Sequence, residues 1–142
     1  MTLLYPILLF FAANPALTLD QVRADPSPEH RAKAAVDFAA VAERWAEAAS
    51  DGNDDARLTV AIRDMVAAME LARDSFAAAG KTSSRNPGTF IGVELRSHDL
   101  LHRLTDLQNK MGADQKSLLD GPIMKIQEIH DVWFDGIMGK KK

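Results

Sequence analysis

Residues 58–76 read LTVAIRDMVAAMELARDSF and show the clearest periodic pattern in the chain. The apolar residues of this stretch recur every three or four positions, at Leu58, Ile62, Met65, Val66, Met69, Ala72 and Phe76. This spacing places them along one side of an α-helix, whereas a half-buried strand would alternate apolar and polar residues. The sequence therefore predicts an amphipathic helix that begins near Asp54 and ends at Gly80.

The segment before this helix shows the same helical spacing. Ser27-Pro28 predicts the start of an earlier helix, because serine caps free backbone amides and proline is tolerated at the first helical position. The turn sequence Asp51-Gly52-Asn53 predicts its end. The residues expected to be buried on this helix are Ala34, Phe38, Val41, Trp45 and Ala48.

Two further helices are predicted downstream. The first begins at Asn86-Pro87, and its expected buried residues are Phe90, Val93, Ser97, Leu100, Leu104, Leu107 and Met111. The second follows the Met111-Gly112 turn, and its expected buried residues are Leu119, Ile123, Ile126, His130, Trp133 and Ile137. Gly121-Pro122 predicts that this last helix either begins at Pro122 or is kinked there.

The fold class follows from these four helices and their connections. No stretch after Asp25 keeps the strict alternation of a strand. Short connections join the first helix to the second and the third to the fourth, so each pair is expected to form an antiparallel hairpin. The sequence therefore predicts an all-α, antiparallel four-helix bundle built from two hairpins, with residues 25–139 as one domain.

The composition limits the classes of function. The 142 residues are 46% hydrophobic and 26% charged, as in a globular protein. The 17 basic and 20 acidic residues give a net charge of −3, and the basic run is confined to residues 140–142. A nucleic-acid-binding protein normally has a basic face, so nucleic acid is not an expected partner. The chain contains no cysteine.

The first 18 residues, MTLLYPILLFFAANPALT, resemble a secretory signal peptide. The apolar run from Leu3 to Ala13 is shorter than the roughly 20 residues that a transmembrane helix needs. We expect cleavage between Ala16 and Thr18, contact with a membrane only during export, and a periplasmic or secreted mature protein. The alternative is that the segment is kept, as a helix packed on the domain or as an anchor.

The connection after Gly80 carries the tail of a phosphate-loop motif, Gly80-Lys81-Thr82. A phosphate loop follows a strand and opens a helix, whereas this sequence closes a helix, and Ser75 stands where the first motif glycine belongs. Nucleotide binding is therefore not expected. Because loops held by rigid helices often carry recognition, Lys81, Arg85 and Asn86 are the candidate binding residues.

Two polar residues interrupt the apolar positions of the last two helices. If these helices pair around a turn near residue 113, Ser97 and His130 lie opposite each other. A buried imidazole needs a hydrogen-bond partner, so a structural Ser97–His130 pair is expected. The alternative is a nucleophile and its base, which would also need an orienting acid; Glu128 and Asp131 are expected to point away.

Other histidines raise the possibility of a metal or a haem. His98 and His102 are four residues apart, a spacing that can bind one zinc ion, although helix-surface pairs of Glu94 with His98 and of His102 with Asp106 explain them equally. His130 could alternatively bind haem, with a methionine such as Met65, Met69 or Met111. No cofactor is the primary expectation, and haem is the alternative.

A family resemblance is visible in the second half of the chain. RNPGTF at 85–90, ELR at 94–96, LLHRL at 100–104 and IQEIHDVWFDGIMGKK at 126–141 occur in this order after Gly80-Lys81. Over roughly residues 80–142 the chain resembles a group of short, signal-peptide-bearing bacterial helical proteins without an assigned activity. This resemblance implies export and transfers no catalytic residue.

These observations predict an exported, non-enzymatic helical bundle that binds another protein. The competing hypothesis is a carrier of haem or metal that uses His130, or His98 and His102. The sequence specifies neither the identity of the partner nor the oligomeric state.

Overall fold

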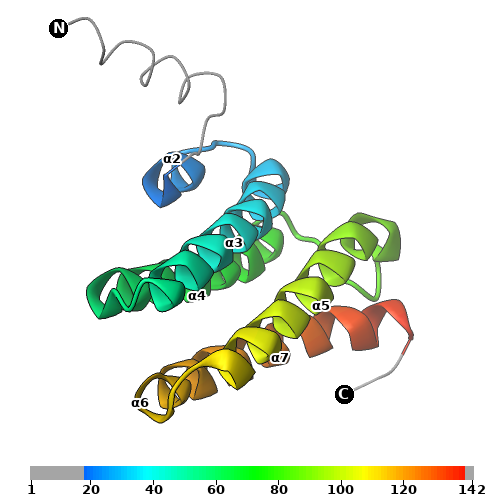
Figure 1. Ribbon diagram of the computed structural model, residues 1–142. Coiled ribbons are helices and arrows are strands. Elements are labelled where there is room, and N and C mark those ends of the chain that lie inside the picture. The colour runs from blue at the N-terminus through cyan, green and yellow to red at the C-terminus, as the bar shows by residue number, and fades with distance from the viewer. Residues whose placement is uncertain (1–17, 140–142) are drawn as a thin grey trace, which may run out of the picture.

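A computed structural model describes residues 18–139, and these are helical without a strand. The four long helices are α3 (Pro28–Asp51), α4 (Asp55–Ala78), α5 (Pro87–Lys110) and α7 (Asp120–Ile137) (Figure 1). The short elements are α2 (Leu19–Arg23), α6 (Ala113–Lys116) and the 3₁₀-helix η1 (Ser117–Leu119). The predicted all-α bundle of two helical hairpins is confirmed.

The helix ends follow the capping residues of the sequence. Ser27 accepts a hydrogen bond from the backbone N–H of His30, and Asp54 accepts one from that of Arg57, so both side chains satisfy amides that lack helical partners. Gly80 adopts φ +72°, and its N–H donates to the carbonyl of Ala77. The next N–H, of Lys81, donates to the carbonyl of Phe76. This is the glycine-terminated helix end that the sequence predicted.

The helices form a ring in which α3 contacts α4 and α5, and α7 contacts α5 and α4. Within each hairpin the helices run antiparallel, whereas α3 and α5 run in the same direction, as Figure 1 shows. Ion pairs agree with this arrangement, because Asp37 contacts Arg96 near one end of the α3–α5 pair and Glu47 contacts Arg103 further along it. The two hairpins therefore lie side by side.

The predicted buried positions of α4, α5 and α7 are confirmed, with Val66, Ile123 and Ile137 half-buried at the margin. The prediction for α3 was partly wrong, because Val41, Trp45 and Ala48 are exposed. Besides Val36, Phe38 and Glu43, the buried residues of α3 are all alanines. They are Ala32, Ala35, Ala39, Ala42, Ala46 and Ala49. Small side chains let the backbones of α3 and α4 approach closely, and the larger residues turn outward.

The fold includes a short helix before residue 25 that the sequence did not predict. Thr18 and Gln21 form a reciprocal capping box at the start of α2. Val22 is 1% exposed and belongs to the core, and α2 contacts both α3 and α4. Residues 1–17, which carry most of the proposed signal peptide, lie outside the described residues. Within residues 18–139, no helix has the length and apolar character needed to cross a membrane.

The last hairpin is connected by α6 and η1 in succession. Helix α7 begins at Asp120, so Pro122 lies in its first turn, where backbone N–H groups have no helical acceptor in any case. The helix therefore begins two residues earlier than the first alternative predicted. Gln115 of α6 ties this connection to the first hairpin, since its side chain bonds Ser50 and Asp55.

Candidate functional site

The connection between α4 and α5, residues 81–86, lines a surface pocket together with the end of α7. The pocket has a volume of about 680 Å³. Phe76 of α4, Phe90 of α5 and Trp133 of α7 contribute to its wall, and their rings pack against one another with centroids 4.3 to 6.1 Å apart. Residues from three helices and one loop therefore meet at one end of the bundle.

The loop is fixed to α7 through Ser83. This side chain is buried, and its hydroxyl donates to the carbonyl of Val132 at 3.1 Å. Gly136 makes the close approach possible, because a Cβ at that position would lie 1.8 Å from Ser83 Oγ and 2.9 Å from the backbone nitrogen of Ser84. The loop is thus packed on a glycine of the last helix and is not merely a surface connection.

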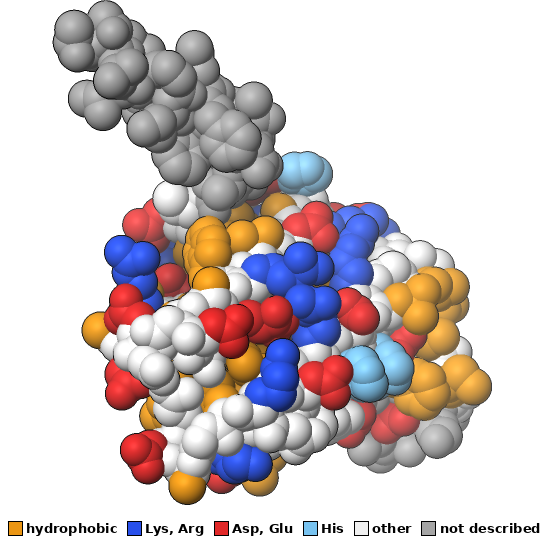
Figure 2. Space-filling view, viewed as in Figure 1, with side chains coloured by type: hydrophobic (Ala, Val, Ile, Leu, Met, Phe, Trp, Pro, Cys, Tyr) orange, Lys and Arg blue, Asp and Glu red, His pale blue; other side chains and the backbone are white. Residues whose placement is uncertain are grey.

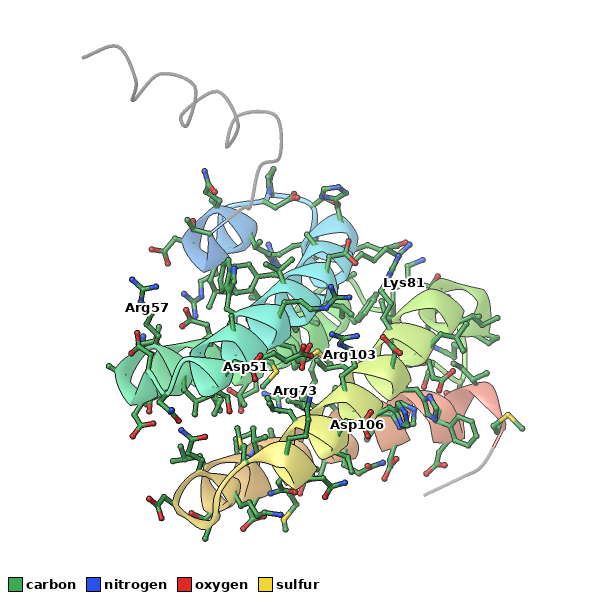
Figure 3. The ribbon with its side chains drawn as sticks, in the orientation of Figure 1. Asp51, Arg57, Arg73, Lys81, Arg103 and Asp106 are labelled. Atoms are coloured by element: carbon green, nitrogen blue, oxygen red, sulfur yellow. The ribbon has the colours of Figure 1, made fainter. Side chains whose placement is uncertain are left out.

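The three candidate binding residues have different positions. Lys81 and Arg85 both line the pocket, whereas Asn86 is not among its lining residues. Lys81 Nζ lies 3.8 Å from a carboxylate oxygen of Glu29, and Arg85 donates to the carbonyl of Gly80 at 3.1 Å. Figure 3 shows Lys81 at the end of the molecule where α5 begins.

Asn86 shapes the loop from within. Its side-chain oxygen accepts the N–H of Thr82 at 3.2 Å, and its own N–H donates to the carbonyl of Thr82 at 2.7 Å. The side chain makes no capping bond to α5, although the helix begins at Pro87 as the sequence predicted. Asn86 therefore stabilises the loop conformation that presents Lys81 and Arg85.

The charged side chains that line the pocket are mostly basic. Arg73 of α4 joins Lys81 and Arg85 around it, and Asp135 is the single acidic residue in the lining. Gly139, the last described residue, also lines the pocket. In a protein with a net charge of −3, this end therefore combines cationic side chains with an apolar wall.

Ser97 and His130 are both buried, as expected, but Glu94 is the polar partner of each. Ser97 Oγ donates to the backbone carbonyl of Glu94 at 2.9 Å, within its own helix. His130 Nε2 lies 2.8 Å from a carboxylate oxygen of Glu94, and Nδ1 lies 3.1 Å from one of Asp131. The prediction of a Ser97–His130 hydrogen bond was therefore wrong. The prediction that Asp131 points away from His130 was also wrong.

Side-chain length explains why Ser97 and His130 have separate hydrogen-bond partners. A serine hydroxyl is short and readily satisfied by a carbonyl one turn back on its own helix. A glutamate side chain is long enough to cross to the neighbouring helix from a position beside the apolar stripe. The serine and the imidazole therefore do not form the nucleophile and base of the alternative hypothesis.

The histidines of α5 lie on its exposed side. His102 Nε2 is 3.6 Å from a carboxylate oxygen of Asp106, which confirms that predicted surface pair. His98 is exposed, and its ring centroid is 5.9 Å from that of His130. Among residues 18–139, no three or more His, Cys, Asp or Glu side chains are grouped as a metal site would need. Metal or haem binding by His130 would require displacing a carboxylate from one ring nitrogen.

Sequence reasoning missed a cluster between α3 and α5. Glu43 is 0% exposed, and its Oε1 accepts from Arg103 Nε at 2.9 Å. The same guanidinium donates to Glu47 at 2.7 Å. The pKa of Glu43 is raised to about 7, mainly because the carboxyl is buried and secondly because Glu47 lies beside it. The four-residue spacing of the two glutamates was a visible signal, but the sequence pattern placed Val41, Trp45 and Ala48 on the buried side of α3 and so gave no reason to expect Glu43 there.

Three comparisons with known proteins bear on this site. The chain matches no protein-family model, no curated protein and no solved structure.

Proposed function

We propose that this protein is an exported, non-enzymatic binding module whose partner is another protein, recognised at the pocket between residues 81–86 and α7. The observation that carries the proposal is the meeting of Arg73, Lys81 and Arg85 around one apolar-walled pocket. Such a pocket fits a partner segment that presents acidic side chains beside an apolar one, because charge complementarity steers association and apolar burial holds the complex.

The rigidity of the pocket supports the proposal. Ser83 fixes the loop to α7, and Asn86 closes it internally, so Lys81 and Arg85 extend from a preformed support. A preformed site loses less conformational entropy when a partner binds than a mobile loop would. Export is proposed on the signal-like character of residues 1–18.

The test of binding uses two double variants of equal charge. The chain is used to capture partners by crosslinking from the exported fraction, as wild type and as Lys81→Ala/Arg85→Ala. The control, Arg23→Ala/Arg63→Ala, removes two arginines that pair with acidic neighbours on their own helices. The expected result is at least a tenfold loss of the captured partner in the first variant only, and weaker capture by wild type as salt rises.

Equal capture by the wild type and both variants would overturn this assignment of the pocket. Equal loss in both variants would show dependence on net charge and would also contradict it. Export is tested separately: a chain lacking residues 1–18 is expected to stay in the cytoplasm, and sequencing of the mature protein is expected to begin near Thr18. Retention of the whole segment on the exported protein would favour the anchor alternative.

A further inference from the structure

The cluster of Glu43, Glu47 and Arg103 joins the two hairpins. The glutamates are one turn apart on α3, and the arginine comes from α5; Figure 3 shows Arg103 in the space between these helices. One guanidinium therefore binds two carboxyl groups. Its bonds of 2.9 Å to Glu43 and 2.7 Å to Glu47 are typical of charge-assisted hydrogen bonds.

One oxygen of this cluster has no donor. Glu43 Oε2 is the buried side-chain nitrogen or oxygen of residues 18–139 that lacks a hydrogen-bond partner. An ionised carboxylate buried with one oxygen unpaired is costly. A proton on Oε2 removes both costs, because it neutralises the group and turns the unpaired acceptor into a donor. Glu47, already fixed by Arg103, is the acceptor one turn away.

We infer that Glu43 and Glu47 share one proton, and that this proton-binding site controls how firmly the α3–α4 hairpin packs against the α5–α7 hairpin. With the proton bound, Arg103, the ionised Glu47 and the neutral Glu43 sum to zero charge. Without it, these three groups sum to one negative charge, and the carboxylate of Glu43 is ionised while buried. The site goes beyond the proposed binding function and does not depend on it.

The charged groups around Glu43 come from the same two helices. Arg44 Nε on α3 lies 3.9 Å from Glu43 Oε1. Arg96 and Asp99 of α5 line a hollow of about 220 Å³ beside the cluster, and Arg96 is paired with Asp37 at 3.3 Å. On this face, formed by α3 and α5, basic and acidic side chains lie next to one another (Figure 2).

The other two long helices bring no charge to Glu43. The buried residues of α4 are apolar except Ser75, and the buried histidine of α7, His130, is bound to Glu94 and Asp131. The pKa of Glu43 is therefore set within the α3–α5 cluster. Burial and Glu47 raise this pKa to about 7, and Arg103 opposes the rise. A hydrogen bond donated by protonated Glu43 is the first cause that lowers the pKa of Glu47.

The direction of the pH effect follows from these shifts. A glutamate with an ordinary pKa of 4.5 releases its proton well below pH 7, whereas Glu43 in the folded protein keeps it to about pH 7. Between these values the folded state binds more protons than the unfolded state, so stability falls as pH rises. The lowered pKa of Glu47 acts in the opposite direction and at lower pH, where stability is lost on acidification.

The test combines a carboxyl titration with unfolding. In the full chain, the ¹³C carboxyl resonance of Glu43 is expected to titrate near pH 7. Urea unfolding of the wild type is expected to show a folding equilibrium constant that falls by up to about a hundredfold between pH 5 and pH 8. Glu43→Gln keeps the shape, is neutral at every pH and can donate to Glu47, so its folding constant is expected to stay nearly level over this range.

A matched control is Glu70→Gln, which removes a half-exposed carboxylate paired with Lys125 and should retain the pH dependence of the wild type. The inference is overturned if Glu43 titrates near its ordinary value of 4.5, or if Glu43→Gln loses stability with pH as the wild type does. Should Glu43→Gln fail to fold, the titration of the wild-type carboxyl alone decides between these outcomes.

Discussion

At the scale of the residue, the buried Glu43 and His130 are each bound by a long side chain from a neighbouring helix, Arg103 and Glu94, which the apolar pattern does not reveal. The sequence identified Ser97 and His130 because they interrupt stripes of large apolar residues. It did not identify Glu94 as their common partner, because a glutamate beside a stripe reads as an exposed residue. The spacing of apolar residues indicated that Ser97 and His130 are buried. Their hydrogen-bond partners depend on side-chain length and on how the neighbouring helices are shifted along each other.

The roles of Glu94 and Ser97 predict unequal costs of truncation. Glu94→Ala leaves the buried Nε2 of His130 without its carboxylate, which is expected to lower the free energy of unfolding by about 1–3 kcal/mol. Ser97→Ala removes only a hydroxyl bonded to its own helix, and a loss below about 1 kcal/mol is expected. Urea unfolding of both variants measures the difference. A larger loss in Ser97→Ala would restore the serine as the partner of the histidine.

At the scale of the element, all four long helices were predicted, but the buried face of the alanine-rich α3 was predicted only in part. In α4, α5 and α7, leucine, isoleucine, methionine and phenylalanine mark the buried side. In α3, Val41 and Trp45 lie on the exposed side, at 39% and 43% exposure, and alanines lie on the buried one. Close helix packing favours the smallest side chains, so size misled the prediction for this helix.

Two alanines of α3 test this corrected face. Ala42 is 0% exposed, and replacing it with leucine is expected to overpack the α3 interface and lower the free energy of unfolding by about 1–3 kcal/mol. Ala48, which the sequence placed inside, is exposed, so Ala48→Leu is expected to change stability by less than about 0.5 kcal/mol. Thermal or urea unfolding compares the two. Greater destabilisation by Ala48→Leu would show that the original face was right.

The contact of the 81–86 loop with α7 predicts a sharp effect at Gly136. In Gly136→Ala the new Cβ would meet Ser83 and the backbone of Ser84, so the loop must move, at an expected cost of about 1–3 kcal/mol. Gly92→Ala, whose Cβ would meet only the end of the Arg96 side chain at 3.8 Å, is expected to stabilise α5 by up to about 1 kcal/mol. Unfolding and amide exchange of residues 81–86 measure both. An unperturbed loop in Gly136→Ala would contradict the packing described.

At the scale of the whole molecule, local connections determine the hairpins and long-range contacts determine how they join. Short turns made the hairpins predictable. The pairing of the two hairpins was not predictable, because it depends on contacts between residues far apart in the sequence, such as Glu43–Arg103 between α3 and α5 and Phe76–Trp133 between α4 and α7. The basic pocket forms only once this pairing brings α4, the loop and α7 together. The sequence therefore predicted Lys81 and Arg85 as binding residues, but it did not predict that residues of α4 and α7 would line the same pocket.

Site-specific photocrosslinking in the exported fraction measures whether a protein partner binds at this pocket. The crosslinker replaces Ser84, which is exposed and lines the pocket, or Asn109, which is exposed near the end of α5. We expect one discrete crosslinked protein from position 84, and we expect it to be lost in Lys81→Ala/Arg85→Ala. No crosslinked protein is expected from position 109. The same product from both positions, or one from position 109 alone, would contradict binding at this pocket.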